Sequence, residues 1–159
     1  MAFPQVAAYN TSVRATSGTS HTVSLPAGIS PGDLLLVFFS TDGDNTISNW
    51  GGFTQIFSAN NGTSAHLSVA YKIALGSDTL TVTTTSSETS AHVSYRITGH
   101  NTSQMPQASS GAVLTDANPD PDSLSPTGGQ KEYLWFAAEG NDDDDIASAY
   151  PLPDNQHTV

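Results

Sequence analysis

Two acidic loops are the parts of this sequence that could hold a metal ion. One contains Asp42 and Asp44, and the other contains four consecutive aspartates, Asp142, Asp143, Asp144 and Asp145. Hard cations such as calcium are bound by several converging oxygen atoms, which carboxylates supply. The spacing does not match an EF-hand loop, because the glycine at its sixth position and the glutamate at its twelfth are missing. We expect either calcium bound by these six aspartates or two solvated acidic loops.

Histidines offer a second kind of chemistry. His66 and His92 lie in matching contexts, Ser-Ala-His-Leu-Ser and Ser-Ala-His-Val-Ser. On neighbouring strands the two imidazoles could approach each other and bind a metal or respond to pH. Each histidine, however, lies opposite the apolar residues of its own strand. The pattern therefore favours exposed polar side chains on a solvent face.

Catalysis has little support in the sequence. The Gly-x-Ser-x-Gly pattern occurs once, at residues 28–32, but it lies in a proline-containing turn before a strand and not between a strand and a helix, and there is no cysteine. Serine and aspartate are so frequent that their numbers neither support nor oppose a Ser-His-Asp triad, and nothing organises a nucleophile. We expect that the protein is not an enzyme and that it needs no cofactor, calcium apart.

Aromatic residues suggest an alternative function as a carbohydrate-binding β-sandwich. Trp50, Tyr71, Tyr95, Trp135 and Tyr150 could together form a platform on which sugar rings stack. The strand phase of Tyr71, Tyr95 and Trp135 places these three in the core instead. Exposure of Trp50 beside Tyr150 would favour the carbohydrate alternative.

The charge is strongly negative and unevenly distributed. The chain has 15 acidic and four basic residues, for a formal net charge of −11, and residues 100–159 hold ten of the acids and one lysine. Such a surface repels phosphate, so we expect no binding to nucleic acid or to anionic membranes. The N-terminus resembles no signal peptide, and the longest apolar run, residues 34–39, is too short to span a bilayer.

The elements that must position these residues are β-strands. Residues 64–74, 79–85 and 91–98 alternate between apolar and polar side chains, and residues 34–39 and 133–138 are continuous apolar runs. Alternation predicts half-buried strands, and the run at 34–39 predicts a central strand covered on both faces. We expect no α-helix beyond a turn. Short strands separated by turns indicate an antiparallel β-sandwich or barrel.

An internal repeat is indicated at an offset of 99 residues. Shifted by that distance, the turn and strand at 33–38 coincide with 132–137, and both strands run into an acidic loop. The pattern predicts a single domain over 1–159, with a first repeat at 22–98, a linker at 99–117 and a partial second repeat at 118–159. Strands equivalent to 64–98 would fall beyond Val159. We therefore expect that the chain continues or that a strand from a partner fills the gap.

The turn and strand motifs carry a resemblance to a known group. The order Leu-Pro-Ala-Gly-Ile-x-Pro-Gly-Asp-Leu-Leu-Leu at 25–36, an acidic loop, Gly-Phe-Thr at 52–54 and Leu-Ser-Val-Ala-Tyr-Lys at 67–72 resembles tailed-bacteriophage virion proteins. Residues 118–124 and 133–138 are similar to the second half of their domain. Phe53 departs from the tryptophan usual at its position.

This resemblance implies a jelly-roll-type β-sandwich and a structural role. The expected function is that of a capsid decoration or accessory protein that binds the outer surface of the virion, or otherwise of a tail or fibre component. The expected partners are the major capsid or tail protein and further copies of the chain. Because such parts sit on symmetry axes, a homo-oligomer, with a trimer as the default, is expected.

Overall fold

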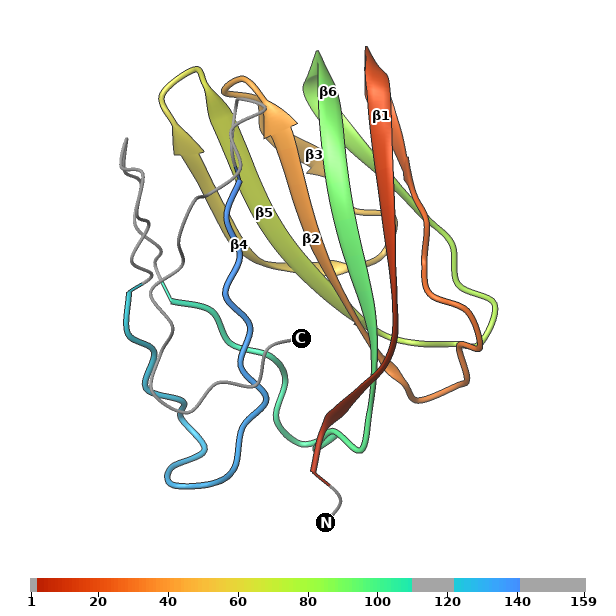
Figure 1. Cartoon of the computed structure of the whole chain (residues 1–159), viewed down its shortest axis with the longest axis vertical. Helices are drawn as coiled ribbons and strands as arrows, with labels where there is room; N and C mark the ends of the chain where they lie inside the picture. The colour runs from red at the N-terminus through yellow and green to blue at the C-terminus, as the bar shows by residue number, and fades with distance from the viewer. Residues whose placement is uncertain (1–2, 110–121, 141–159) are drawn as a thin grey trace.

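The computed structural model describes residues 3–109 and 122–140, and within them the fold is all-β. Six strands form one antiparallel sheet in the order β1-β6-β2-β5-β4, and β3 pairs with β6 beside this path (Figure 1). The strands are β1 (Gln5–Val23), β2 (Leu34–Asp42), β3 (Ile47–Asn49), β4 (Thr54–Asn61), β5 (Ala65–Ile73) and β6 (Leu80–Thr98). The predicted all-β class is confirmed.

β2 is the central strand, as its apolar run predicts. It is paired along its length with β5 on one side and β6 on the other, so that Leu36 lies opposite both Tyr71 and Tyr95. Leu35 and Leu36 point to opposite faces of the sheet, and both are buried. A strand with apolar side chains on both faces is stable only where both faces are covered.

The turn before β2 is built by Pro31, Gly32 and Asp33. Gly32 adopts a φ of 90°, which an L-residue rarely takes. The Asp33 carboxylate accepts a hydrogen bond from the Ser30 amide at 2.9 Å and lies 3.4 Å from the Arg96 guanidinium on β6. This turn therefore ties the start of β2 to the neighbouring strand.

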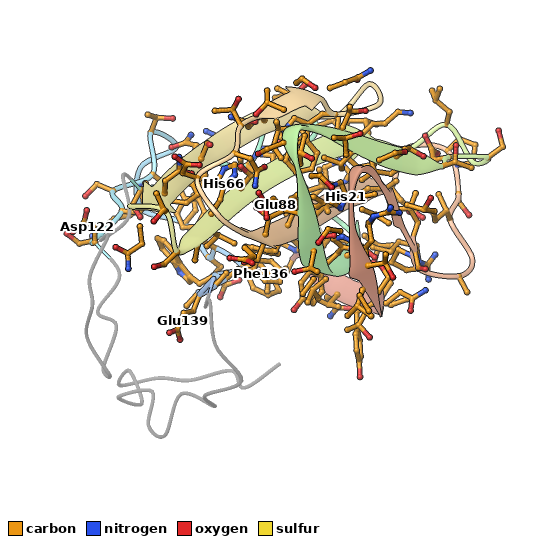
Figure 2. All side chains as sticks on the ribbon, turned by 90° about the horizontal axis from the view of Figure 1, so that it is seen from above. His21, His66, Glu88, Asp122, Phe136 and Glu139 are labelled. Carbon is orange, nitrogen blue, oxygen red and sulfur yellow. The ribbon has the colours of Figure 1, made fainter. Side chains whose placement is uncertain are left out.

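β1 and β6 are each 19 residues long and bend sharply near their middle. Their pairing shifts register between Arg14 and Gly18 and again between Gly18 and Ser20. Such irregularities increase the bend and twist of a strand. Figure 2 shows β6 turning through a steep corner. The bend carries the Leu80 end of β6, with β3 and the Val23 end of β1, over one face of the sheet.

The sheet therefore has an inner face, covered by the bent strands, and an outer face. Both faces carry apolar clusters. The inner cluster contains Val23, Leu35, Val37, Phe39, Trp50, Phe53, Ala70, Ala74, Leu80 and Val82. The outer cluster contains Leu34, Leu36, Val69 and Ile97, with the partly buried Val6, Phe38, Ile56, Phe57, Tyr71, Ile73, Tyr95, Leu134 and Phe136 packed on it. Of the two faces, the inner one alone is closed by strands that the structure describes.

The predicted strand at 133–138 is wrong. This segment is extended but pairs with no strand, and it crosses the outer face through contacts of Leu134 and Phe136 (Figure 1). β2 is already paired with a strand on each side. A segment that lies on the face of the sheet can therefore pack its side chains there but cannot form backbone hydrogen bonds with β2. The 99-residue repeat stays a prediction, because residues 110–121 and 141–159 of its second copy lie outside the described residues.

Candidate functional site

The polar residues that alternate along β5 and β6, among them His66 and His92, face the enclosed side of the sheet, contrary to expectation. His66 is 1% exposed and His92 is 3% exposed, and Ser68, Ser90 and Ser94 beside them are buried as well. The prediction that these histidines lie on a solvent face is therefore wrong. The bent halves of β1 and β6 cover this side of the sheet. The alternation of polar and apolar residues along β5 and β6 separates the two faces, but it does not show which face other strands cover.

A continuous hydrogen-bonded network joins two of the histidines. Ser90 Oγ lies 2.7 Å from His21 Nδ1 and 2.7 Å from His92 Nε2. Beyond them, His21 Nε2 lies 3.0 Å from Thr84 Oγ1, and His92 Nδ1 lies 2.9 Å from Ser12 Oγ. Three of these contacts, Ser12 with His92 and His21 with both Ser90 and Thr84, join β1 to β6 across the corner where both strands bend.

The direction of each hydrogen bond follows from one end of the network. The Thr84 hydroxyl donates to the Ser86 carbonyl at 2.7 Å, so it must accept from His21 Nε2–H. A neutral His21 then accepts from the Ser90 hydroxyl at Nδ1. Ser90 in turn accepts from His92 Nε2–H, which leaves His92 Nδ1 as an acceptor.

The other end of the network has the same direction. The Ser24 amide donates to Ser12 Oγ at 3.0 Å, and the Ser12 hydroxyl donates to His92 Nδ1. Every donor and acceptor of the network is therefore satisfied when both imidazoles are neutral. Satisfied polar groups are what a buried site requires.

Burial favours these neutral imidazoles. Desolvation, with repulsion from His21, lowers the pKa of His92 to about 4. Burial, and then the nearby charge of Arg14, lowers the pKa of His21. Protonation of both rings would aim two N–H donors at Ser90 Oγ and leave its hydroxyl proton without an acceptor in the network.

This geometry supports a structural role for the network. A catalytic serine needs access to substrate and a base held by a third group. Ser90 is buried between two imidazoles, and Thr84 and Ser12 occupy the positions where a carboxylate would hold the base. The His92 ring is stacked on Phe39 with centroids 4.9 Å apart.

His66 is not part of this network. It belongs to β5, whereas His92 belongs to β6, and β2 lies between the two strands. His66 Nε2 contacts Ser58 Oγ at 2.9 Å and Ser68 Oγ at 2.7 Å, and burial lowers its pKa. The alternative that His66 and His92 approach each other on neighbouring strands is therefore not found. Within residues 3–109 and 122–140, no group of three His, Cys, Asp or Glu side chains could hold a metal ion.

The first acidic loop lies at the end of β2. Asp42 and Asp44 are both exposed, and the loop is fixed by the buried Asn45, whose Nδ2 donates to Thr41 Oγ1 at 2.9 Å and to the Asp42 carbonyl at 3.1 Å. Asp142, Asp143, Asp144 and Asp145 lie outside the described residues. Calcium binding by the two loops together therefore stays a prediction.

The predicted aromatic platform is rearranged. Trp50 is buried, at 7% exposure, and its indole N–H donates to Gln55 Oε1 at 2.6 Å. Trp135, which was expected in the core, is 54% exposed and lies with its ring 5.8 Å from that of Tyr133. Tyr150 lies outside the described residues. Trp50 therefore offers no surface on which a sugar could stack.

The outer face is the candidate binding surface. Tyr95 is partly buried there among three other rings, with centroid distances of 4.9 Å to Phe136, 5.9 Å to Phe38 and 6.4 Å to Tyr9. Beside them is a shallow hollow lined by apolar residues such as Val13, Leu67 and Val93 together with polar ones such as Ser40 and Glu139. Figure 2 shows Phe136 on the opposite side of the sheet from His66.

The apolar residues of β5 and β6 thus lie on the less covered side of the sheet. Val69 and Ile97 are buried, but Tyr71, Ile73 and Val93 are only partly so. Neighbouring apolar side chains that stay partly exposed are one mark of sites that contact other proteins. It is the feature that sequence reasoning missed, because the apolar stripe was assigned to the core.

Comparison with known proteins adds no relative. No family model, no curated protein and no solved structure matches this chain. Within the part of the chain that the structure describes, no helix has the length and hydropathy needed to cross a membrane.

Proposed function

We propose that this chain is a structural component of a tailed-bacteriophage virion and binds other virion proteins through its outer face. A capsid decoration or accessory protein is the favoured role, and a tail or fibre part is the other. The observation that carries the binding role is which side chains the sheet encloses. The polar side chains of β5 and β6 are enclosed, whereas within the described part of the chain their apolar side chains are covered only in part, by the segment that carries Leu134 and Phe136.

The chemistry of the outer face suits a protein partner. Aromatic and aliphatic side chains, among them Phe38, Tyr71 and Tyr95, contribute most to protein–protein contacts when a partner excludes water from them. Interfaces between permanently associated subunits are more apolar than other protein surfaces. The assignment to a virion rests on the resemblance of residues 25–36, 52–54 and 67–72 to phage virion proteins.

The proposal is tested on particles of the bacteriophage that encodes the chain. Peptides of the chain are sought by mass spectrometry in particles purified by density gradient. We expect them in a fixed ratio to the major capsid protein. Presence in infected cells together with absence from purified particles would overturn the proposal.

The binding surface is tested with a pair of variants. Leu67→Lys places a charge in the hollow of the outer face, and Leu75→Lys places one on an exposed turn between β5 and β6. Added to particles that lack the chain, Leu67→Lys should bind weakly, whereas Leu75→Lys should bind like the wild type. Equal binding by both variants would show that the outer face is not the binding surface.

Carbohydrate binding remains a second candidate because of one observation, the exposed Trp135 beside Tyr133. Sugars stack on exposed aromatic rings, and Trp50 is too buried to respond. Titration with a panel of oligosaccharides while tryptophan fluorescence is recorded tests this role. A change that Trp135→Phe removes would favour it, and the absence of any change would leave the structural role alone.

A further inference from the structure

Exposed apolar side chains are concentrated on β1. Among the described residues, five large apolar side chains are exposed, and three of them, Phe3, Tyr9 and Val13, lie on β1 or directly before it. Tyr9 is 67% exposed and Val13 is 72% exposed. Both point to the outer face, because Tyr9 packs beside Tyr95 and Val13 lines the hollow.

β1 is also an edge strand of the sheet. It pairs with β6 alone among the described strands, so its other edge presents unpaired backbone N–H and C=O groups (Figure 1). Native proteins usually protect such edges with charges or proline. From Gln5 to Val23 there is no proline, and Arg14 is the single residue with a full charge. In a chain of net charge −11, the first acidic residue is Asp33.

The two exposed side chains make this edge self-complementary. Tyr9 and Val13 are four residues apart, with Thr11 midway between them on the same face. If two copies pair antiparallel about a two-fold axis at Thr11, Tyr9 of each copy lies opposite Val13 of the other. Aromatic and β-branched residues form favourable cross-strand pairs, and here the pair occurs twice. No like charges meet, because Arg14 lies opposite Ala8.

We propose that β1 pairs with β1 of a second copy, in the register that places Tyr9 opposite Val13, and joins two sheets into one. The regular part of β1 from Ala8 to Arg14 matches the usual length of a strand. Beyond Arg14 the strand bends away from the edge. An isologous contact of this kind closes after two copies.

One local bond has to be exchanged on pairing. The Thr11 amide is bonded to the side-chain Oδ1 of Asn10 at 2.9 Å, and Asn10 Nδ2 donates to the Leu25 carbonyl at 3.1 Å. The second Asn10 bond can persist while the Thr11 amide takes a new partner. The isolated chain therefore keeps part of this edge satisfied before it associates.

The other edge strand, β4, lacks the features that favour self-pairing. Its residues from Thr54 to Asn61 are uncharged as well, but the fully exposed ones are polar: Thr54, Gln55, Ser58 and Asn60. A bulge between Gln55 and Phe57 also interrupts its pairing with β5. β4 therefore offers a matched control for experiments on β1.

Disulfide trapping tests the register directly, because the chain has no cysteine of its own. Thr11→Cys places a thiol on the proposed axis, where the two Cβ atoms of a directly opposed pair lie about 4.5–5.5 Å apart, at the upper limit of what a disulfide joins after a small backbone shift. Thr54→Cys places the same substitution on the edge of β4. Under mild oxidation, Thr11→Cys should form a covalent dimer much faster than Thr54→Cys.

Light scattering of the wild-type chain measures the association itself. We expect a mass of two chains, each of 16.6 kDa, at high concentration. Val13→Lys should lower the association constant about tenfold or more, because it removes a favourable pair twice. Leu75→Lys is the control, since Leu75 is 72% exposed like Val13 but lies outside β1. Circular dichroism confirms that both variants fold.

Each contrary result overturns the proposal. A monomer at all concentrations excludes pairing, and a mass of three chains excludes a closed two-fold contact. A dimer in which the two cysteine variants cross-link equally excludes the register. Failure of the chain to occur in virions would overturn the proposed function and leave this dimer unaffected.

Discussion

Phe38 and Phe39 are neighbours on β2, yet they belong to different environments. Phe39 is fully buried on the inner face, where His92 stacks on its ring and His21 and Trp50 contact its edge. Phe38 is only partly buried on the outer face, where its ring packs beside those of Tyr95 and Phe136. The inner face is closed by β1, β3 and β6 of the same chain. Among the described residues, the outer face is covered by one extended segment, which carries Leu134 and Phe136.

The comparison teaches that hydropathy does not decide which face is enclosed. The inner face buries His21, His66 and His92, and it can do so because serine and threonine hydroxyls lie within hydrogen-bond distance of each ring. The outer face carries the more apolar side chains of β5 and β6, and no second layer of strands covers it within residues 3–109 and 122–140. We infer that the inner face maintains the fold and that the outer face is available for assembly.

The largest expected effect is a difference in stability between variants of these two phenylalanines. Phe39→Ala should lower the free energy of unfolding by about 3–5 kcal/mol, because it leaves a cavity among rigid neighbours. Phe38→Ala should cost only about 1–2 kcal/mol, because its ring is already partly in water. Denaturant unfolding of the two variants measures both. Equal losses would mean that the outer face is as well packed as the inner one.

A somewhat smaller effect is expected from pH, because the stability of the fold depends on the buried His92 of the inner face. The folded state holds the pKa of His92 at about 4, so below the ordinary value of 6.5 the unfolded chain binds a proton that the folded chain does not. Stability should therefore fall as the pH decreases from about 6.5 to about 4, by roughly 2–3 kcal/mol for His92.

The measurement is urea unfolding between pH 7 and pH 5, where most carboxylates stay ionised. His92→Gln should have a smaller slope of stability against pH than the wild type. A wild-type stability that does not change over this range would contradict the assignment of neutral, buried imidazoles.

Ser90→Ala should have a moderate effect. The substitution leaves His21 Nδ1 and His92 Nε2 without their common partner, and buried polar atoms without partners cost about 1–3 kcal/mol. Ser40→Ala on the outer side of β2 is the control, with an expected change within about 0.5 kcal/mol. Thermal or denaturant unfolding of the two variants should show this difference, and similar losses would argue against the network.

The smallest effect on stability is expected for Val13 on the edge strand β1. Val13→Lys should leave the free energy of unfolding of the monomer within about 0.5 kcal/mol of the wild type, because the side chain is mostly in solvent. Unfolding of dilute protein measures this, so that association does not contribute. A large loss would show that Val13 stabilises the monomer, and its effect on association would then have to be judged from other variants.

Local sequence patterns predicted the central elements of the sheet. The apolar run at 34–39 became β2, the alternation at 64–74 became β5, and the predicted strands at 79–85 and 91–98 are the two halves of β6. Most of β1 was missed, apart from its end at Val23, because much of the strand is serine and threonine, whose strand character is set by pairing with β6. The extended segment at 133–138 has strand-like residues but no free neighbour.

The candidate site was less predictable because it, too, depends on pairing between strands that are distant in the sequence. Burial of His66 and His92 depends on the bend of β1 and β6, and this bend arises at register shifts that no short pattern specifies. The network needs Ser12 and Thr84, which are far apart in sequence. Only the pairing of strands brings them to the same corner.

Solvent labelling of the outer face tests the central inference most directly. Hydroxyl radicals label exposed aromatic and aliphatic side chains, and labelling can be compared between the isolated chain and purified virions. We predict that Tyr9, Tyr71 and Tyr95 are labelled in the isolated chain and protected in the virion, while Leu75 is labelled in both. Equal labelling of the three tyrosines in both states would contradict the assignment of the outer face to assembly.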